Sequence, residues 1–344
     1  MMTLGRVRIL VQAVTFLVLV YGGNLFGYYL AQKLSQSFPS LACAFNQETG
    51  AYCTLISLQH GLYHRVGEGY QMLQRITVDM LLPTLFTFLT FLAFFVVLNK
   101  TFCAWICPLG TVQEWLYALG RRLSLPLRRL EGTALARVRP VKWVVLIALV
   151  LVIPLIGGLG YGPHALVDPF CQLCPSRMVN TLLTANVEQG LAVPTNDWAS
   201  AAFAAGRNML FGFVIVAALV MRQPFCRICP MLALHAAFRR VSPLRLVKIQ
   251  HDRCASCGIC TKACPMDIPE ISACHGAKAF HADCTMCGRC AEFCPDDGII
   301  KLKWGPVTLF SSAKEYFRRR LQREKPDGTP VKVKAPARRP SAAE

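Results

Sequence analysis

The sequence predicts a membrane protein in two parts: an all-α bundle of four membrane-spanning helices, followed by a small C-terminal α+β domain. Hydrophobic residues make up 54% of the 344 residues and charged residues only 16%, which is too apolar for an ordinary soluble protein. The long apolar stretches lie in the first two thirds of the chain, whereas two groups of four cysteines follow residue 253. We expect a membrane domain over 1–245, a cysteine-rich domain over 246–305 and a basic, partly disordered tail over 306–344.

Four apolar stretches are each about as long as a helix that crosses a bilayer. They cover residues 9–30, 76–98, 143–161 and 202–221. Arg6 and Arg8 precede the first stretch, and its length and the lack of an obvious small-residue cleavage site favour a retained span over a signal peptide. Four spans place both termini on the same side of the membrane.

The basic residues predict which side that is. The segment between the second and third spans is far more basic than its neighbours, with Lys100, Arg121, Arg122, Arg128, Arg129, Arg137, Arg139 and Lys142. Short basic loops stay in the cytoplasm, so we expect both termini and the cysteine-rich domain there, in a bacterial inner membrane. Loops 31–75 and 162–201 would then face the periplasm. The formal charge of +18 reflects this topology and contact with membrane lipid rather than nucleic acid, for which the sequence has no recognisable motif.

The C-terminal cysteines repeat one spacing, C-x2-C-x2-C-x3-C-P, over 254–265 and 284–295. This spacing holds two [4Fe-4S] clusters in a bacterial-type ferredoxin, where the fourth cysteine of each run reaches the other cluster. Zinc sites and disulfide frameworks do not require it twice. Gly258 and Gly288 suit loops that fold closely around a cluster. The predicted ligand sets are Cys254, Cys257, Cys260 and Cys294 for one cluster, and Cys284, Cys287, Cys290 and Cys264 for the other.

Two shorter motifs follow the second and fourth spans. They are a C-x3-C-P and a C-x2-C-P, each continued by an apolar helical stretch, which indicates an internal repeat. Their cysteines, which we call the membrane-mouth cysteines, are Cys103, Cys107, Cys226 and Cys229. They could supply four thiolates to a further cluster or metal, or they could be reduced cysteines that pack a turn.

Four more cysteines fall in the loops predicted to face outward, where thiols are not kept reduced. Cys43 and Cys53 lie in the first loop, and Cys171 and Cys174 form a C-x2-C-P in the second. Structural disulfides, an exchangeable dithiol and a joint metal site all remain open, because connectivity cannot be deduced from sequence. Cys274 would pack between the two cluster motifs.

Other candidate residues are fewer. No C-x-x-C-H occurs, so covalent c-type haem is not predicted. His60 and His64 are spaced to share one helix face, as ligands near a quinone or metal or simply as polar residues. Asp79 and Arg207 lie near the expected outer ends of two spans, where they could contact a quinone or act as anchors.

Four features occur together: the four spans, the Cys103-x3-Cys107-Pro108 motif, the Cys226 and Cys229 pair and the two-cluster domain. In this combination the chain resembles the membrane polyferredoxins of the NapH, NosR and MauN type, over about residues 5–305. The resemblance implies electron transfer at the cytoplasmic membrane, in several members as a quinol dehydrogenase component that feeds a periplasmic system. The Cys226 pair departs from the family pattern, with two intervening residues instead of three. The four cysteines of the outward loops are not part of the nitrate-reductase pattern and suggest a separate periplasmic partner.

Two functions follow. The first is a membrane-bound iron–sulfur protein, a subunit of a quinol dehydrogenase-like oxidoreductase, that passes electrons between a quinone pool or cytoplasmic donor and a periplasmic redox protein, alongside other electron-transfer subunits. The alternative is a transmembrane thiol–disulfide relay that uses Cys171 and Cys174 in metalloprotein maturation. A regulatory role has no supporting motif.

Overall fold

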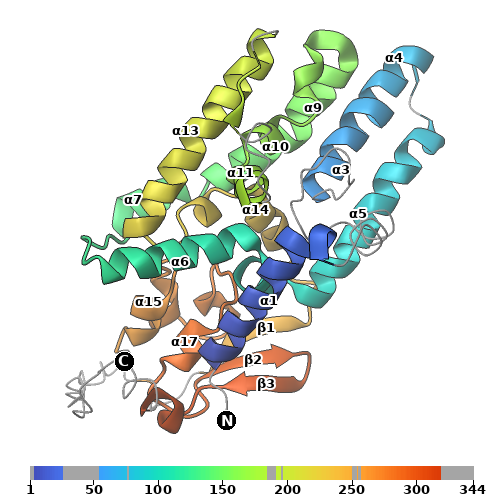
Figure 1. Cartoon of the computed structure of the whole chain (residues 1–344). Helices are drawn as coiled ribbons and strands as arrows, with labels where there is room; N and C mark the ends of the chain where they lie inside the picture. Colours follow the sequence, from blue (N-terminus) through green and yellow to red (C-terminus); the bar gives the residue numbers. More distant parts are fainter. Residues whose placement is uncertain are drawn as a thin grey trace.

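The computed structural model describes residues 4–25, 54–75, 77–183, 191–194, 197–249, 254 and 257–318. Figure 1 shows long helices that extend away from a smaller C-terminal domain of short helices and strands. In chain order the N-terminal helices are α1 (Leu4–Leu25), α3 (Thr54–His60), η1 (Gly61–Glu68), α4 (Gly69–Leu73), α5 (Val78–Leu98), η2 (Phe102–Ile106), α6 (Pro108–Arg122), α7 (Gly132–Val138), α8 (Val141–Val145), η3 (Leu146–Val152), α9 (Ile153–Ile156), η4 (Gly157–Tyr161), η5 (His164–Leu166), α10 (Pro169–Leu173), α11 (Pro175–Leu183), α13 (Trp198–Val220), η6 (Phe225–Arg227) and α14 (Pro230–Ala237).

Three helices of the described residues are long and apolar enough to cross a membrane: Leu4–Tyr21, Gly132–Tyr161 and Trp198–Val220. They correspond to the first, third and fourth predicted spans. The stretch predicted as the second span also folds as a helix, α5, although several of its side chains lie outside the described residues. Large apolar side chains stay exposed on these helices, as expected of surfaces that contact lipid; they include Val144, Ile147, Met209, Phe213 and Val216.

The segment predicted as the first outward loop contains helices. Within it, α3, η1 and α4 follow one another without a break over 54–73 and contact α5, α9 and η4. The contact with η4 is tight, because a Cβ added to Gly67 would lie 2.6 Å from the Cα of Gly158. Small residues allow helix backbones to approach in this way, so residues 54–73 pack as helices against the bundle.

The segment predicted as the second outward loop contains short helices that pack against the bundle. Both α10 and α11 contact α13, and α11 also contacts α6. Cys171 is only 5% exposed and belongs to the same buried cluster as Leu109 of α6 and Phe225 of η6. Cys171 is therefore part of the core of the bundle.

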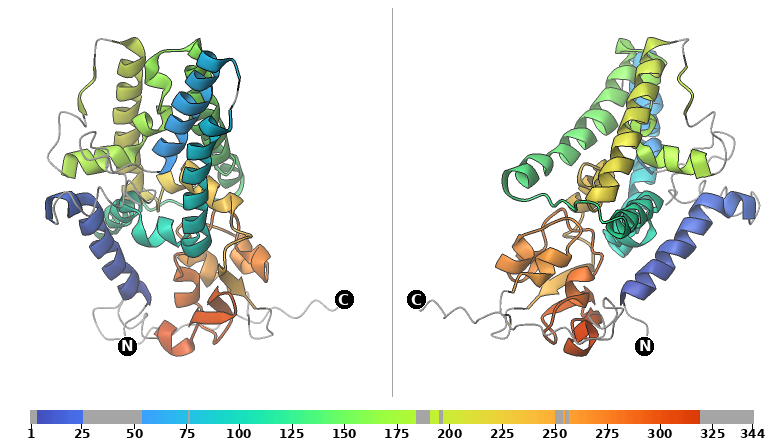
Figure 2. Two further views of the ribbon diagram at one scale, coloured as in Figure 1. Left: turned by 90° about the vertical axis from the view of Figure 1, so that its right-hand side faces the viewer. Right: turned by 60° about the vertical axis from the view of Figure 1, so that its left-hand side comes forward.

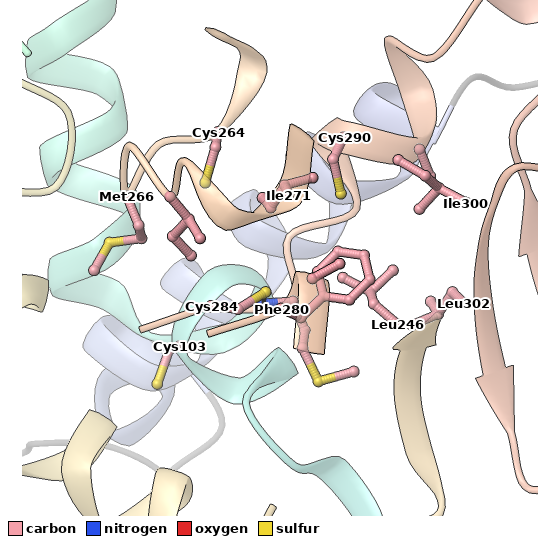
Figure 3. Close-up of a cluster of buried hydrophobic side chains, with 14 of the residues drawn as sticks. Cys103, Leu246, Cys264, Met266, Ile271, Phe280, Cys284, Cys290, Ile300 and Leu302 are labelled. Atoms are coloured by element: carbon pink, nitrogen blue, oxygen red, sulfur yellow. Dashed lines mark hydrogen bonds between the residues drawn. The ribbon is translucent and has the colours of Figure 1, made fainter. Parts of the chain in front are cut away.

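The C-terminal domain combines a three-stranded antiparallel sheet with short helices. Its elements are β1 (Leu244–Lys248), α15 (Ile259–Ala263), α16 (Glu270–Ala273), η7 (Ala277–Ala279), α17 (Arg289–Glu292), β2 (Ile300–Trp304) and β3 (Val307–Ser311), with the strands in the order β1-β2-β3. Leu246 pairs with Leu302, and both are buried against the cysteine-bearing helices (Figure 3). Because β1 begins at Leu244 and β3 ends at Ser311, the domain extends beyond the predicted boundaries at 246 and 305.

The first helix docks on this domain. Gly5 donates its backbone N–H to Glu292 Oε1 at 3.0 Å, and Arg8 Nη1 donates to the carbonyl oxygen of Cys287 at 3.0 Å. Figure 2 shows α1, in dark blue, starting beside the red C-terminal segments. The start of α1 and the cysteine-rich domain thus lie at the same end of the molecule.

Ion pairs attach a second part of the bundle. Arg139, which follows α7, makes a bidentate contact with Glu270 at 2.7 and 2.9 Å and a contact from Nε to Asp283 Oδ2 at 3.0 Å. Lys142 of α8 also pairs with Asp283. Two of the basic residues that predict the topology therefore also hold the two domains together.

Candidate iron–sulfur sites

The C-terminal cysteines lie in the local geometry that their spacing predicts. Gly258 and Gly288 precede α15 and α17 with φ of +71° and +76°. A side chain is strained in this left-handed conformation, so glycine is required for the turn. The expectation that these glycines serve the cysteine loops is confirmed in the structure.

The two runs of cysteines lie next to each other. Burial raises the pKa of the Cys264 thiol, and the neighbouring Cys287 and Cys284 of the second run raise it further. Cys294 in turn neighbours Cys260 of the first run; its pKa is raised to about 11, chiefly by burial. Each fourth cysteine therefore lies beside the opposite run. Eight thiols so arranged fit two [4Fe-4S] clusters, because iron at each site stabilises the thiolate that burial alone disfavours.

A single metal ion and a [4Fe-4S] cluster require different distances between the four thiolates. Among the described residues, no group of three or more Cys, His, Asp or Glu side chains is arranged to hold one metal ion. Four thiolates around a single Zn²⁺ would lie about 3.8 Å apart, given bonds of about 2.3 Å. In a [4Fe-4S] cluster each thiolate binds its own iron, so the sulfur atoms are further apart.

The four membrane-mouth cysteines come together in the structure. Cys107 and Cys229 each directly precede a proline at the first position of a helix, α6 and α14, where proline costs no hydrogen bond. Burial raises the pKa of the Cys103 thiol well above its usual value, and nearby Cys107, Cys229 and Cys226 raise it further. Two separate sequence motifs thus bring four thiols near one another, two of them buried (Cys103 and Cys226) and two partly buried (Cys107 and Cys229).

This group adjoins the ferredoxin domain. Cys103 and Cys226 belong to the same buried cluster as Cys264, Cys284 and Cys290, part of which Figure 3 shows. Burial lowers the pKa of the Lys100 ammonium group to about 8, and the nearby Cys284 and Cys103 act in the opposite direction and raise it. Its Nζ donates to the carbonyl oxygen of Ala282 at 2.5 Å.

An arginine and a glutamine hold the Cys226 turn. Arg227 donates to the carbonyl oxygens of Met266 and Pro265 and pairs with Asp267 at 2.6 Å, which ties the turn to the segment that follows Cys264. The Nε2 of Gln113, on α6, donates to Cys226 Sγ at 3.6 Å, and its Oε1 accepts the Phe225 N–H at 3.0 Å. Gln113 is fully buried.

The other predicted residues lie in different parts of the molecule. Cys171 lies in α10, Cys174 directly precedes α11, and Cys43 and Cys53 lie outside the described residues. Asp79 is in the first turn of α5, where a carboxylate interacts favourably with the helix dipole. Half-buried Cys274 packs against the core of the C-terminal domain, as expected.

Arg207 and the two histidines lie in the bundle. Arg207 is buried in α13 and donates to the carbonyl oxygen of Ala192 at 3.3 Å. His60 and His64 do share a helix face, with ring centres 5.7 Å apart. His164 lies 6.0 Å from His64, which sequence spacing alone could not indicate.

The contacts of the two glutamines and of Lys100 with the cysteine sites were not predicted from the sequence. A signal for the glutamines exists, since 53–59 (CTLISLQ) and 107–113 (CPLGTVQ) share Cys, Leu and Gln at the same positions. Lys100 has no such signal, because one lysine after a span resembles any other topology-determining charge.

Family comparisons agree with this geometry. The model of a 4Fe-4S binding domain matches twice, at residues 80–126 and 206–248, which include the two membrane-mouth motifs and confirm the internal repeat. The model of a 4Fe-4S dicluster domain matches residues 253–300. The C-terminal domain therefore holds two [4Fe-4S] clusters.

Several curated proteins are similar over about half of the chain. YccM of Escherichia coli K12 is 25% identical over 52% of this chain and 45% of its own length. The regulatory protein NosR of Pseudomonas aeruginosa is 26% identical over 56% of this chain and 23% of its own length. The methylamine utilization ferredoxin-type protein MauN of Methylobacillus flagellatus is 24% identical over 48% of each chain.

The match thus spans less than half the length of each of these relatives. No solved structure gives a significant match. From the family-model matches and these identities, the chain is a distant homologue of polyferredoxin-type proteins such as YccM, NosR and MauN.

Proposed function

We propose that the protein transports single electrons at the bacterial inner membrane, between a quinone pool or cytoplasmic donor and a redox partner on the periplasmic side. One of its relatives, YccM, is named for electron transport, and iron–sulfur clusters are one-electron carriers when bound. In this proposal the ferredoxin domain is cytoplasmic, and the protein acts as one subunit of a quinol dehydrogenase-like assembly.

The observation that carries the proposal is the continuity between the two groups of cysteines. Cys103 and Cys226 of the membrane mouth share one buried cluster with Cys284, Cys290 and Cys294, so a cofactor held by the first group would adjoin a cofactor held by the second. Lys100 supplies a buried positive charge between them, which favours added negative charge on either side. An electron entering one domain thus has a protein-enclosed route to the other.

The chain's own residues also keep the two domains in a constant relation. Glu114 of α6 pairs with Arg289 of α17 at 3.2 Å and accepts a hydrogen bond from Gln223 at 3.2 Å. Together with Arg227 and Arg139 it forms docking contacts on three sides of the domain. Rigid docking suits electron transfer because the separation of carriers must not fluctuate.

The test compares anaerobically purified wild type with a Cys103→Ser/Cys229→Ser variant. We expect the variant to contain about four irons fewer per chain while the EPR signals of the two ferredoxin clusters persist. In proteoliposomes, reduction of the ferredoxin clusters by a quinol analogue should be lost in the variant. Cys274→Ser is the matched control, since it removes a half-buried cysteine outside every motif.

Unchanged iron in the double variant would confine the clusters to the ferredoxin domain and contradict the proposed route. Unchanged quinol-dependent reduction in the variant would contradict a route through the membrane-mouth cysteines, and absence of quinol-dependent reduction in the wild type would contradict the quinone as electron donor. The periplasmic partner can then be sought by crosslinking from the opposite face.

A further inference from the structure

A second cysteine turn in the bundle repeats the first. Residues 169–175 read PFCQLCP and residues 224–230 read PFCRICP, identical at five of seven positions. In each, the second cysteine directly precedes the proline that begins a helix, α11 or α14. The backbone agrees as well, with φ/ψ of −68°/123° at Cys174 and −68°/124° at Cys229.

The glutamine that holds the turn is repeated too. Gln59 Nε2 donates to Cys171 Sγ at 3.1 Å, and its Oε1 accepts the Phe170 N–H at 3.2 Å. Gln113 makes the same pair of contacts to Cys226 and Phe225. Each glutamine also donates to the carbonyl oxygen four residues before it, at 2.8 Å for Gln59 and 3.2 Å for Gln113. Both glutamines are fully buried.

These contacts are unusual for cysteines that only pack a core. A buried neutral cysteine behaves as a small hydrophobic residue and needs no amide donor. Burying a glutamine is costly unless its amide is hydrogen-bonded, and a donor aimed at sulfur favours the thiolate over the thiol. The structure thus supplies to Cys171 the same donor that it supplies to Cys226.

The two turns share one apolar environment. A single buried cluster contains Leu55 and Phe170 from one copy and Leu109 and Phe225 from the other. Cys174 and Cys229 both pack against it. Figure 1 shows α10, which contains Cys171, further from the strands of the C-terminal domain than α14.

We propose that Cys171 and Cys174 are thiolate ligands of an additional iron–sulfur cluster inside the bundle, positioned by Gln59 as Gln113 positions Cys226. The inference rests on the proposed function, since such a cluster would extend the electron route from the membrane mouth into the bundle. It differs from a thiol–disulfide relay, because the 5% exposure of Cys171 leaves little access for an incoming thiolate.

The test measures iron and acid-labile sulfide per chain, with EPR, in the anaerobically purified full-length protein. Relative to wild type, a Cys171→Ser/Cys174→Ser variant is expected to lose about two or four irons, for one [2Fe-2S] or [4Fe-4S] cluster, with the ferredoxin signals intact. Cys274→Ser should lose none. Unchanged iron in the Cys171/Cys174 variant overturns the inference.

The two proposals fail separately. If iron falls in the Cys103→Ser/Cys229→Ser variant but not in the Cys171→Ser/Cys174→Ser variant, the proposed function stands and this inference is wrong. Unchanged iron in both variants overturns both proposals. Should the cysteine variant fail to fold, Gln59→Leu decides: it is expected to shift one EPR signal that Gln113→Leu leaves in place, and an unaltered spectrum overturns the inference.

Discussion

The turns at 171–174 and 226–229 have nearly the same sequence and backbone but different surroundings. The first of their two variable positions explains why the surroundings differ. Arg227 reaches out to Asp267 and the carbonyl oxygens beside Cys264, whereas the equivalent Gln172 bonds locally to Asp168 and the carbonyl oxygen of Ala165. One turn is thereby joined to the ferredoxin domain and the other remains within the bundle. A repeated structural unit can thus acquire a separate role through a single side chain.

The largest effect should come from breaking the contact that distinguishes the two turns. Arg227→Ala would leave Asp267, which is 9% exposed, without its buried partner, at a cost of about 3–5 kcal/mol. Gln172→Ala removes only local hydrogen bonds and should cost about 1 kcal/mol. Thermal loss of iron–sulfur absorbance in detergent measures both. Equal shifts for the two variants would mean that Arg227 does not couple the domains.

A smaller effect is expected where the two turns are alike. Gln113→Leu would leave the buried Phe225 N–H without its acceptor and remove the donor to Cys226, for about 1–3 kcal/mol. Gln59→Leu should cost a similar amount through Phe170. The same thermal assay applies. If only one variant is destabilised, the glutamines do not play equivalent structural roles.

The basic residues between the second and third spans offer a third comparison. Arg139→Leu removes a partly exposed bidentate contact with Glu270 and a contact with Asp283, so we expect a loss of about 1–2 kcal/mol. Arg137→Leu removes an exposed charge from the same helical segment and should leave the melting temperature unchanged. A matching loss in Arg137→Leu would indicate that net charge, rather than docking, stabilises the assembly.

The smallest effect is a pH dependence at the same contact. The hydrogen bond from Arg139 is the main cause that lowers the pKa of Glu270 below its usual value of about 4.3. A carboxyl group with a lower pKa in the folded state stabilises the protein above the unfolded pKa, and that contribution declines as the pH falls toward the folded pKa. The melting temperatures of wild type and Glu270→Gln should therefore differ most at pH 6 and converge toward pH 4. A constant difference would show that the Glu270 charge does not contribute.

Local geometry near the cysteines was the most predictable part of the site. The ferredoxin spacing predicted the glycine turns, because these depend on residues only a few positions apart. The proximity of the four membrane-mouth cysteines, in contrast, depends on how α6 and α14 pack. Gln59 and Gln113 were missed because a glutamine in an apolar helix shows no partner in sequence.

The helices inside the predicted loops could not be located from hydropathy. Hydropathy counts length and apolarity, so it does not identify a short helix that packs against a bundle. The helix over 54–73 and the helices α10 and α11 are of this kind. Their buried polar contacts, such as Gln59 with Phe170, are satisfied only once segments more than 100 residues apart meet.

By itself the sequence determined the apolar helices, the two cluster-binding runs and the repeat of Cys-Pro turns, since each depends on spacing along the chain and on backbone geometry within a few residues. Only the tertiary structure decided that four distant thiols share a site, that Lys100 lies between two groups of cysteines, and that Cys171 is in the core. Those facts depend on burial and on which side chains meet in the folded chain. The hydrogen bonds and charge interactions concerned form between residues that are far apart in sequence.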